Sequence, residues 1–461
     1  MRPVEQVLTV ARMRAAEEAL IAAGASVDHL MQTAGRGAAE WVWRIAGHHA
    51  VTVLCGPGNN GGDGYVIAQA LHERGGKVQV VAAAEPKTAA ARNARALFGG
   101  KVLGPQAEVH GDVLVDCLFG SGLVRPLSDD HLALLQGLAA RHHRVVAVDL
   151  PSGIESDSGA ALNEGLPRNH LTIALGAWKQ AHFLMPAAAT MGTLRLVGIG
   201  CAAMPGAPGV VARPWLAPPA ADAHKYRRGL LAVIGGAMPG AAQMACLAAQ
   251  GAGAGYVRLL AEQPAAAPDL VVDPRRPAEA LGDARIGAVL VGPGLGRGDH
   301  ARVRLEAALA AGRPLVLDAD ALILLRRGEG GEGAILTPHE GELVALEQTF
   351  GLSGEGTRLD RARALATASR AVVIAKGPDS VVAAPDGRAA FAHRASAWLS
   401  VAGTGDVLAG IVASRLATGA EPFAAACEGL WLHGEAARLA GPAFSACALA
   451  GTVRAAYAAT L

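Results

Sequence analysis

The sequence predicts an α/β protein made of two three-layer domains, each with a largely parallel sheet between helices. A chain of 461 residues is too long for one ordinary hydrophobic core. Hydrophobic residues make up 51% of it and charged residues 18%, which is typical of folded domains rather than disordered segments. Short runs rich in valine, isoleucine and leucine alternate with alanine-rich stretches, a pattern that indicates parallel strands connected by helices.

Ten of these runs are the predicted strands. Those of the N-terminal half are Val51–Cys55, Lys77–Ala83, Asp112–Phe119, Arg144–Leu150 and Leu171–Gly176. Those of the C-terminal half are Leu230–Gly235, Val289–Gly292, Pro314–Asp320, Ala334–Thr337 and Ala371–Lys376. Most neighbouring runs are far enough apart in sequence for a crossover helix between parallel strands.

A proline-rich segment separates the two halves. Met204–His224 contains five prolines and little charge, which is typical of a linker. We therefore expect a first domain over residues 1–212, a linker over 213–223 and a second domain over 224–461.

The composition argues against several classes of partner. A net charge of +1 produces no overall field that would attract nucleic acid. The six cysteines are scattered without a CxxC pair, which favours a reducing cytoplasmic location over disulfides or a zinc site. Gly229–Val257 is uncharged and long enough to cross a bilayer, but its seven glycines favour a strand, a turn and a buried helix. No membrane association is expected.

A glycine-rich run follows the first predicted strand. Gly56–Gly64 contains five glycines and precedes Tyr65–Arg74, which has helical spacing. Glycines allow backbone N–H groups to approach an anion at a helix N-terminus. The spacing fits neither a dinucleotide fingerprint nor a Walker loop. A merely tight turn is the alternative, although it would not need the asparagines and the aspartate of this run.

Two more strands of this half end in an acid. Asp116 precedes CLFGSG and Asp149 precedes LPSG. Ligands of open parallel sheets bind beyond the carboxyl ends of the strands, so these runs and the glycine-rich run are expected to converge on one crevice. Asn60, Asp116 and Ser152 would supply hard oxygen donors, which suit an alkali or alkaline-earth cation better than zinc.

The runs GPGNNGGDGY, DCLFGSG and VDLPSGIESDSG resemble the NAD(P)H-hydrate epimerase family, which has a Rossmann-like domain, over about residues 5–205. The resemblance implies a potassium ion held by Asn60, Asp116 and Ser152, and Lys179 matches a family lysine. The segment Met31–Gly35 departs from the glutamate and asparagine usual there. The hydrate-binding residues that the resemblance implies are Asn59, Asn60, Gly61, Gly62, Asp63, Gly120, Ser121, Gly122, Leu123, Val124, Arg125, Pro126 and Asp149.

The chemistry of such a domain needs an acid and a base. Epimerisation at the hydroxyl-bearing carbon C6 requires reversible loss and return of water or of a ring substituent. Asp149 is the preferred acid–base candidate, because a carboxylate in a partly desolvated crevice can be tuned toward neutrality. Asp63 is the competing candidate, and the sequence does not separate the two.

The run AGTGDVLAG is the strongest pattern of the second half. Gly403, Thr404 and Gly405 would expose backbone N–H groups and form an anion hole for a phosphoryl group in transfer. Asp406 would lie in the first turn of an apolar helix, Val407–Leu416, where it could accept a proton from an attacking hydroxyl. An ordinary aspartate stabilised by the helix dipole is the alternative.

Other strand ends of this half carry GPGLG, DAD, TPHEGEL and KGPDS, the last followed by a predicted hairpin. Together with GTGD they resemble the ADP/ATP-dependent NAD(P)H-hydrate dehydratase family, which has the ribokinase-like fold, over about residues 224–461. The resemblance implies phosphorylation of the C6 hydroxyl by an adenine nucleotide with Mg²⁺, followed by elimination of phosphate. The sequence does not decide between ADP and ATP, but resemblance to fused members of the family favours ADP. The YRR turn at 226–228 and Ser445-Ala446-Cys447 depart from the family pattern. The resemblance implies that Ala241, Gly294, His339 and Asp406 face the hydrate and that Lys376, Gly377, Pro378, Asp379, Ser380 and Gly405 contact the nucleotide.

The expected function is therefore repair of hydrated NADH and NADPH by an epimerase and an ADP-dependent dehydratase that accepts the S epimer, in a homo-oligomer. One alternative keeps the second fold but makes it a small-alcohol kinase that phosphorylates without elimination. Another makes the first domain a non-catalytic ligand-sensing or protein-binding module. The fused asparagine-glycine domain argues against the kinase, since its chemistry serves chiefly a partner that accepts one epimer. Three polar strand ends argue against the non-catalytic module.

Overall fold

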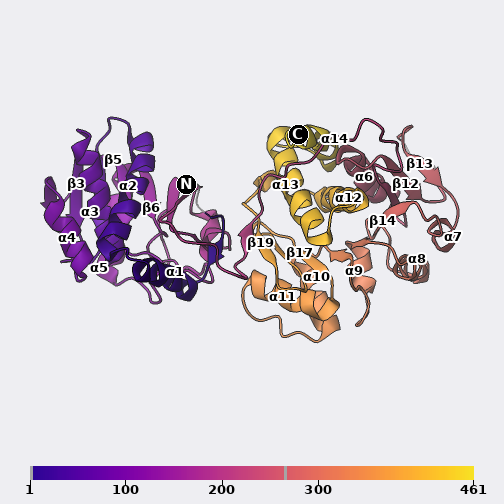
Figure 1. Ribbon diagram of the computed structural model, residues 1–461, viewed down its shortest axis with the longest axis horizontal. Coiled ribbons are helices and arrows are strands. Elements are labelled where there is room, and N and C mark those ends of the chain that lie inside the picture. The colour runs from indigo at the N-terminus through magenta and orange to yellow at the C-terminus, as the bar shows by residue number, and fades with distance from the viewer. Residues whose placement is uncertain (1–3, 264–266) are drawn as a thin grey trace. The chain divides into compact units, whose positions relative to one another are not determined.

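The computed structural model describes residues 4–263 and 267–461 (Figure 1). The chain divides into two compact units, Met1–Gly209 and Val210–Leu461. The division lies before the expected domain end at residue 212, and the expected linker 213–223 belongs to the second unit. Leu216 shows why: its side chain is buried among helices and its N–H donates to the carbonyl oxygen of Thr460 at 3.3 Å. The expected linker is thus packed against the second unit at Leu216 rather than free along its length.

The described residues of the first unit form a seven-stranded sheet in which all neighbouring strands are parallel. The order is β4 (Lys101–Leu103), β3 (Val78–Ala82), β2 (Val51–Cys55), β5 (Gly111–Cys117), β6 (His142–Val148), β7 (Leu171–Leu175) and β9 (Thr193–Val197). A short parallel pair, β1 (Val7–Leu8) with β8 (Trp178–Lys179), lies outside this sheet.

Helices cover both faces of this sheet because its strands bury alternate side chains on opposite sides. Val53 packs in one core cluster with α2 (Val27–Ala46), α3 (Asn59–Glu73) and α4 (Ala89–Leu97). Leu54, the next residue, packs in another cluster with α5 (Asp129–Ala140). The helix α1 (Val10–Ala22) packs separately, through Met13 and Ala16.

The second unit contains a ten-stranded mixed sheet within the residues that the structure describes. The order is β10 (Gly209–Val210), β19 (Ala389–Phe391), β18 (Val381–Ala383), β17 (Val372–Ala375), β16 (Ala334–Leu336), β15 (Leu315–Leu317), β14 (Ile286–Val291), β11 (Leu230–Ile234), β12 (Tyr256–Leu260) and β13 (Val271–Asp273). Strands β17 through β13 are parallel, and β17, β18 and β19 are antiparallel.

This sheet also lies between two helix layers (Figure 1). One layer is α6 (Pro239–Gly251), α12 (Thr404–Ala417), α13 (Pro422–Ala440) and α14 (Ala446–Ala458). The other is α7 (Pro277–Ala280), α8 (Asp299–Ala310), α9 (Asp320–Leu324), α10 (Glu340–Phe350) and α11 (Arg358–Ser369). The helix α12 is buried over most of its length between the sheet and its neighbours, and most of its residues are accordingly apolar.

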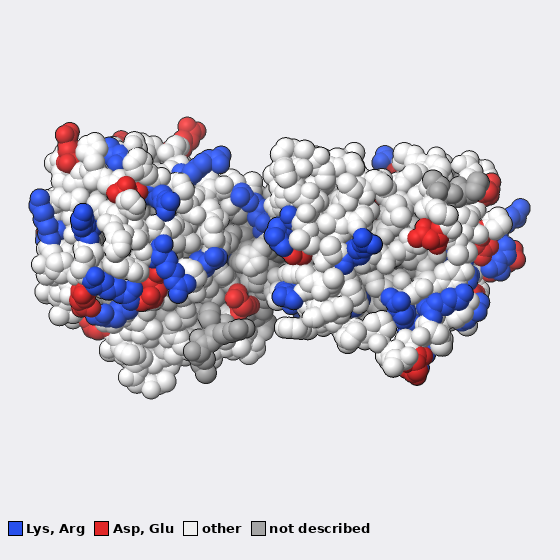
Figure 2. Space-filling view, turned by 90° about the horizontal axis from the view of Figure 1, so that it is seen from above, with Lys and Arg blue, Asp and Glu red and all other residues white. Residues whose placement is uncertain are grey.

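The predicted fold class is confirmed. Each of the ten predicted strands is present, as β2, β3, β5, β6, β7, β11, β14, β15, β16 and β17. Gly229–Val257 holds β11 and α6, and no helix in the described part of the chain is long and apolar enough to cross a membrane. Basic and acidic side chains are interspersed on the face shown in Figure 2, which agrees with the net charge of +1.

Candidate active sites

The glycine-rich run is helical for most of its length, which corrects the sequence prediction. The helix α3 begins at Asn59 rather than at Tyr65. A Cβ on Gly61 would lie 1.9 Å from the carbonyl oxygen of Gly56, and one on Gly64 would lie 2.8 Å from Sγ of Cys55. The glycines therefore bring the first turns of α3 against the ends of β2 and β5, in addition to leaving the helix N-terminus open to a ligand.

We expect Gly61→Ala to destabilise the first unit by about 1–3 kcal/mol, since the added methyl group has no room against backbone atoms. Gly58→Ala is the matched control, because a Cβ on this residue of the same run would meet no atom within 4 Å. Thermal unfolding followed by circular dichroism measures the difference. Equal melting temperatures for the two variants would contradict the packing role.

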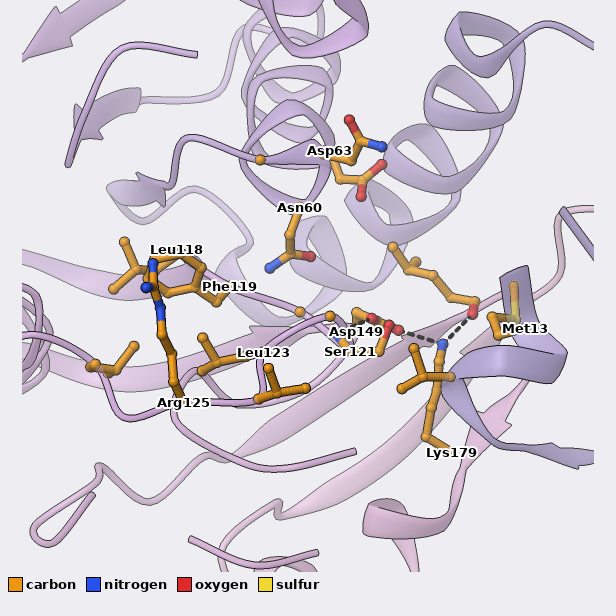
Figure 3. A pocket seen from close by; sticks show the side chains of 18 of the residues that line it. Met13, Asn60, Asp63, Leu118, Phe119, Ser121, Leu123, Arg125, Asp149 and Lys179 are labelled. Carbon is orange, nitrogen blue, oxygen red and sulfur yellow. Dashed lines mark hydrogen bonds and ion pairs between the residues drawn. The ribbon is translucent and has the colours of Figure 1, made fainter. Parts of the chain in front are cut away.

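A cavity of about 840 Å³ opens at the carboxyl ends of β2, β5 and β6 (Figure 3). It brings together most of the residues that the sequence assigned to hydrate binding, but Gly61 and Gly62 are buried behind it in α3. The sequence-assigned residues that line it are Asn59, Asn60, Asp63, Gly120, Ser121, Gly122, Leu123, Val124, Arg125, Pro126, Asp149 and Lys179.

A buried ion pair lies at the floor of this cavity. Nζ of Lys179 is 2.5 Å from Oδ1 of Asp149 and 2.7 Å from the carbonyl oxygen of Leu175 (Figure 3). The N–H of Ser121 donates to Oδ2 of Asp149 at 2.9 Å. Burial raises the pKa of the Asp149 carboxyl, but Lys179 and Ser121 outweigh burial and the pKa is lowered. This corrects the expectation that Asp149 is tuned toward neutrality: it is an ionised carboxylate with both oxygens engaged.

Asp63 has the opposite environment. Its carboxyl lines the cavity from α3 and has no hydrogen-bond partner among the described residues. Burial, followed by the like charges of Asp149 and Glu17, raises the pKa of Asp63 well above its usual value, and Lys179 only partly opposes this. Two carboxyls whose environments separate their pKa values in this way are suited to different roles. Of the two, Asp63 is the better candidate for the proton-donating acid.

The residues expected to hold a cation are only partly assembled. Ser152 donates its hydroxyl to Oδ1 of Asp116 at 2.7 Å, and its N–H donates to Oδ2 at 3.0 Å. Both atoms of the Asn60 side-chain amide are buried without a hydrogen-bond partner. A buried amide oxygen of this kind needs a partner, and a monovalent cation would supply one. The oxygen donors present therefore fit a potassium ion, with Asn60 as the open ligand.

Sequence reasoning missed two contributions to this site. His182 holds the Asp149 backbone, with Nε2 donating to its carbonyl oxygen at 2.8 Å, and Asp149 itself has a φ of 65°. Burial lowers the pKa of His182 to about 4, so this ring is neutral. The second contribution comes from α1, whose residues Arg14 and Glu17 line the cavity. The spacing of Val10, Met13, Arg14 and Glu17 on one helical face is a signal that could have indicated it.

A second cluster lies at the carboxyl ends of β15, β16 and β17 in the second unit. Nζ of Lys376 is 2.6 Å from Oδ1 of Asp318 and 3.8 Å from Oε2 of Glu342. Burial lowers the pKa of Lys376, but these two carboxylates outweigh burial and the pKa is raised. A Cβ on Gly405 would lie 3.4 Å from the same Nζ. The ammonium group is thus beside the N-terminus of α12, and together they attract an anion.

The GTGD run forms the start of α12. Gly403 caps the helix with a φ of 91°, a conformation that suits glycine. The Thr404 N–H and hydroxyl are both used, on the Val401 carbonyl at 3.4 Å and 2.9 Å. Within the described residues no acceptor takes the N–H of Gly403, Gly405 or Asp406. Of the three residues predicted to form the anion hole, Gly403 and Gly405 therefore have free N–H donors and Thr404 does not, and Asp406 adds a donor that was not predicted.

Asp406 is partly buried in the first turn of α12. Burial and then the negative charge of Asp318 raise the pKa of its carboxyl to about 6, against the opposing effect of Lys376. A carboxylate with such a pKa is a suitable general base near neutral pH. His433 supports the turn and was missed from sequence: its Nε2 donates to the Thr404 carbonyl at 3.0 Å, and burial lowers its pKa to about 4.

The remaining predicted residues of this half divide into two groups. Gly294 and Ala241 are neighbours, since a Cβ on Gly294 would lie 3.1 Å from Cβ of Ala241. Gly377 and Pro378 are exposed beside Lys376, and the hydroxyl of Ser380 donates to the Gly377 carbonyl at 2.7 Å.

Two predicted ligands also serve the protein itself. Nδ1 of His339 accepts the Glu342 N–H at 3.2 Å as the cap of α10, although its side chain stays 61% exposed. Asp379 is buried, with Oδ1 at 2.8 Å from Nε of Arg358. The cap leaves His339 open to a ligand, whereas Asp379 is turned toward Arg358.

Two family models match the chain, one in each unit. Residues 27–181 match the model described as YjeF-related protein N-terminus. Residues 231–454 match the model described as NAD(P)H-hydrate dehydratase.

Curated relatives match over nearly the whole chain. The chain is 35% identical to the bifunctional NAD(P)H-hydrate repair enzyme Nnr of Gloeobacter violaceus, over 92% of each chain. It is 34% identical to the enzyme of the same name from Salinibacter ruber, over 94% of this chain and 92% of the relative. A solved ADP/ATP-dependent NAD(P)H-hydrate dehydratase from Bacillus subtilis, co-crystallised with ATP/Mg²⁺, is 26% identical over 53% of this chain and 95% of its own, with a TM-score of 0.46. The chain therefore belongs to the family of bifunctional NAD(P)H-hydrate repair enzymes, with an epimerase domain followed by a nucleotide-dependent dehydratase domain.

Proposed function

We propose that the second unit phosphorylates the C6 hydroxyl of the S hydrate with ADP and then eliminates phosphate to restore the nicotinamide ring. The observation that carries this is Asp406, a carboxyl with a pKa of about 6 in the same helical turn as the free N–H groups. Asp406 takes the hydroxyl proton, while the Gly405 N–H and the Lys376 ammonium stabilise the charge of the transferring phosphoryl group. Phosphate leaves more readily than hydroxide, which is the reason for using a nucleotide.

Magnesium is proposed to enter with the nucleotide. No group of three histidine, cysteine, aspartate or glutamate side chains suited to a metal occurs within residues 4–263 and 267–461. Mg²⁺ usually keeps several waters and binds through one or two carboxylates together with substrate phosphates, so such a group is not needed. Asp318 and Glu342 are carboxylates beside the proposed phosphate site, 2.6 Å and 3.8 Å from Nζ of Lys376.

The first unit is proposed to interconvert the R and S hydrates through an iminium ion. Asp63, whose raised pKa favours the protonated form, protonates the C6 hydroxyl, and the C6–O bond breaks as water leaves. The lone pair of the adjacent ring nitrogen forms a double bond to C6, so the ring becomes a cation. The Asp149 carboxylate stabilises that cation, because it is held ionised by Lys179. Water then returns to the other face of C6.

A coupled assay tests both proposals. A mixture of hydrated NADH epimers is incubated with ADP and Mg²⁺, and recovery of nicotinamide absorbance is followed together with chromatographic separation of the epimers. We expect all of the hydrate to be converted to NADH, with one phosphate released for each NADH restored. Accumulation of a phosphorylated hydrate with no recovery of NADH would instead indicate a kinase that phosphorylates without elimination.

Potassium is proposed to bind beside the glycine-rich turn, with Asn60 as its open ligand and Asp116 and Ser152 behind it. The bound cation would order the loop that donates the Ser121 N–H to Asp149. We expect replacement of potassium by tetramethylammonium to slow epimerisation by wild type, and Asn60→Leu to remove this cation dependence. The dehydratase rate on pure S hydrate, measured in the same samples, should not follow the change if the ion acts only in the first unit.

A further inference from the structure

The epimerase cavity contains a third carboxyl that the mechanism above does not use. Glu17 lines the cavity from α1, a helix that lies before the residues matched by the family model for this unit. Its neighbours on the same helical face, Met13 and Arg14, also line the cavity, and Met13 is drawn beside Lys179 in Figure 3. One face of α1 is thus a wall of the site.

The position of this wall is fixed by packing. Met13 and Ala16 are buried in a core cluster with Ala177, and a Cβ on Gly176 would lie 2.3 Å from Cε of Met13. The N–H of Val10 donates to the Asp157 carboxylate at 2.9 Å at the start of the helix. Glu17 follows Ala16 directly, so its backbone is anchored, although its side chain makes no hydrogen bond to any residue that the structure describes.

The carboxyls of this cavity are not equivalent. Both oxygens of Asp149 are engaged by Lys179 and Ser121, so Asp149 cannot easily accept a proton. Asp63 and Glu17 have no hydrogen-bond partner within the part of the chain that the structure describes, and they come from different helices. Burial, followed by Asp149, raises the pKa of Glu17, against the opposing effects of Lys179 and Arg14. A raised pKa makes the ionised Glu17 a better base.

We propose that Glu17 is the catalytic base of epimerisation. It accepts a proton from the water that adds to C6, whereas Asp63 is the acid that donates a proton to the leaving hydroxyl. This rests on the proposed iminium route. Water adds with its electron pair to C6, the C6–N π electrons return to nitrogen, and the surplus proton passes to the Glu17 carboxylate. Glu17 then loses that proton to solvent and Asp63 regains one, which resets the site without any other reactant.

Glu17→Gln tests the assignment, with Glu18→Gln as the matched control because Glu18 is its exposed neighbour outside the cavity. Pure R hydrate is converted to S hydrate without nucleotide and the epimers are separated by chromatography. We expect kcat to fall by about 100- to 10,000-fold in Glu17→Gln with little change in KM, whereas Glu18→Gln keeps the wild-type rate. The dehydratase rate on S hydrate should be unchanged in both variants.

Two further measurements separate catalysis from structure. The wild-type rate should fall at low pH as Glu17 becomes protonated, and Glu17→Gln should lose that acidic limb. Added formate should restore activity to Glu17→Ala, which a loss of helix packing would not allow. Full epimerase activity of Glu17→Gln with an unchanged pH profile would overturn the proposal, as would a Glu17→Ala variant that formate cannot rescue. Absence of epimerisation by wild type would instead reject the proposed function itself.

Discussion

Asp406→Asn is expected to lower the dehydratase kcat by about 100- to 10,000-fold, since the amide cannot accept the proton of the attacking hydroxyl. For wild type, the rate should fall as the pH drops through about 6, because the Asp406 carboxyl with a pKa of about 6 becomes protonated and loses its function as base. Initial rates on pure S hydrate with ADP and Mg²⁺, measured from pH 5 to 8, give both results.

Asp299→Asn is the matched control for Asp406. Asp299 also lies in the first turn of a helix of the second unit, α8, but it is exposed. Replacing it removes only a favourable helix-dipole interaction, worth about 0.3–1 kcal/mol of stability, and should leave the rate unchanged. If both variants kept the wild-type rate, Asp406 would be an ordinary first-turn aspartate and the dehydratase centre would lie elsewhere.

Lys179→Met is expected to abolish epimerisation and to destabilise the first unit by about 3–5 kcal/mol, because it leaves the buried Asp149 carboxylate without its counterion. The charge of Asp149 also makes this stability deficit depend on pH. Without Lys179, burial raises the pKa of Asp149 in the folded state above its unfolded value. The stability deficit of the variant should therefore be largest near pH 8 and shrink as acidification protonates Asp149.

Chemical denaturation at several pH values measures this deficit. Lys77→Met is the control, since Lys77 is an exposed lysine of the same unit. Lys179→Met together with Asp149→Asn should recover part of the lost stability but none of the activity, because the double variant no longer buries an unpaired charge. A pH-independent deficit in Lys179→Met would show that lost packing, rather than the charge of Asp149, causes the destabilisation.

Much of the fold was predictable because the first sheet is parallel, the second is largely parallel, and helices cover both faces of each. Fully buried strands such as Val51–Cys55 appear as continuous apolar runs, and the acids that follow them mark the carboxyl ends where ligands bind. Short edge strands, such as β4 and β13, carry too little pattern for such a prediction. The ordered segment 213–223 was also missed, because its packing depends on side chains distant in sequence.

The candidate sites were predicted as residue types at strand ends, but their protonation states were not. Asp149 and Asp63 are aspartates that line the same cavity, but Lys179 and Ser121 lower the pKa of Asp149, whereas burial and neighbouring carboxyls raise the pKa of Asp63. Lys179 lies 30 residues from Asp149 in sequence, and its direction toward that carboxyl is a tertiary property. The sequence spacing of α1 indicates one helical face, but the position of that face at the cavity depends on the packing of Met13 against Gly176 and Ala177, which is also a tertiary property.

The central claim is that the first unit converts R hydrate into the epimer that the second unit dehydrates. The most direct test supplies pure R hydrate with ADP and Mg²⁺ to wild type and to Asp63→Asn, and follows recovery of nicotinamide absorbance. With wild type, we predict full recovery from pure R hydrate. With Asp63→Asn, recovery should be no faster than the epimerisation of R hydrate without enzyme. Pure S hydrate should be repaired at the same rate by both proteins. Recovery from R hydrate at the wild-type rate by Asp63→Asn would contradict the account.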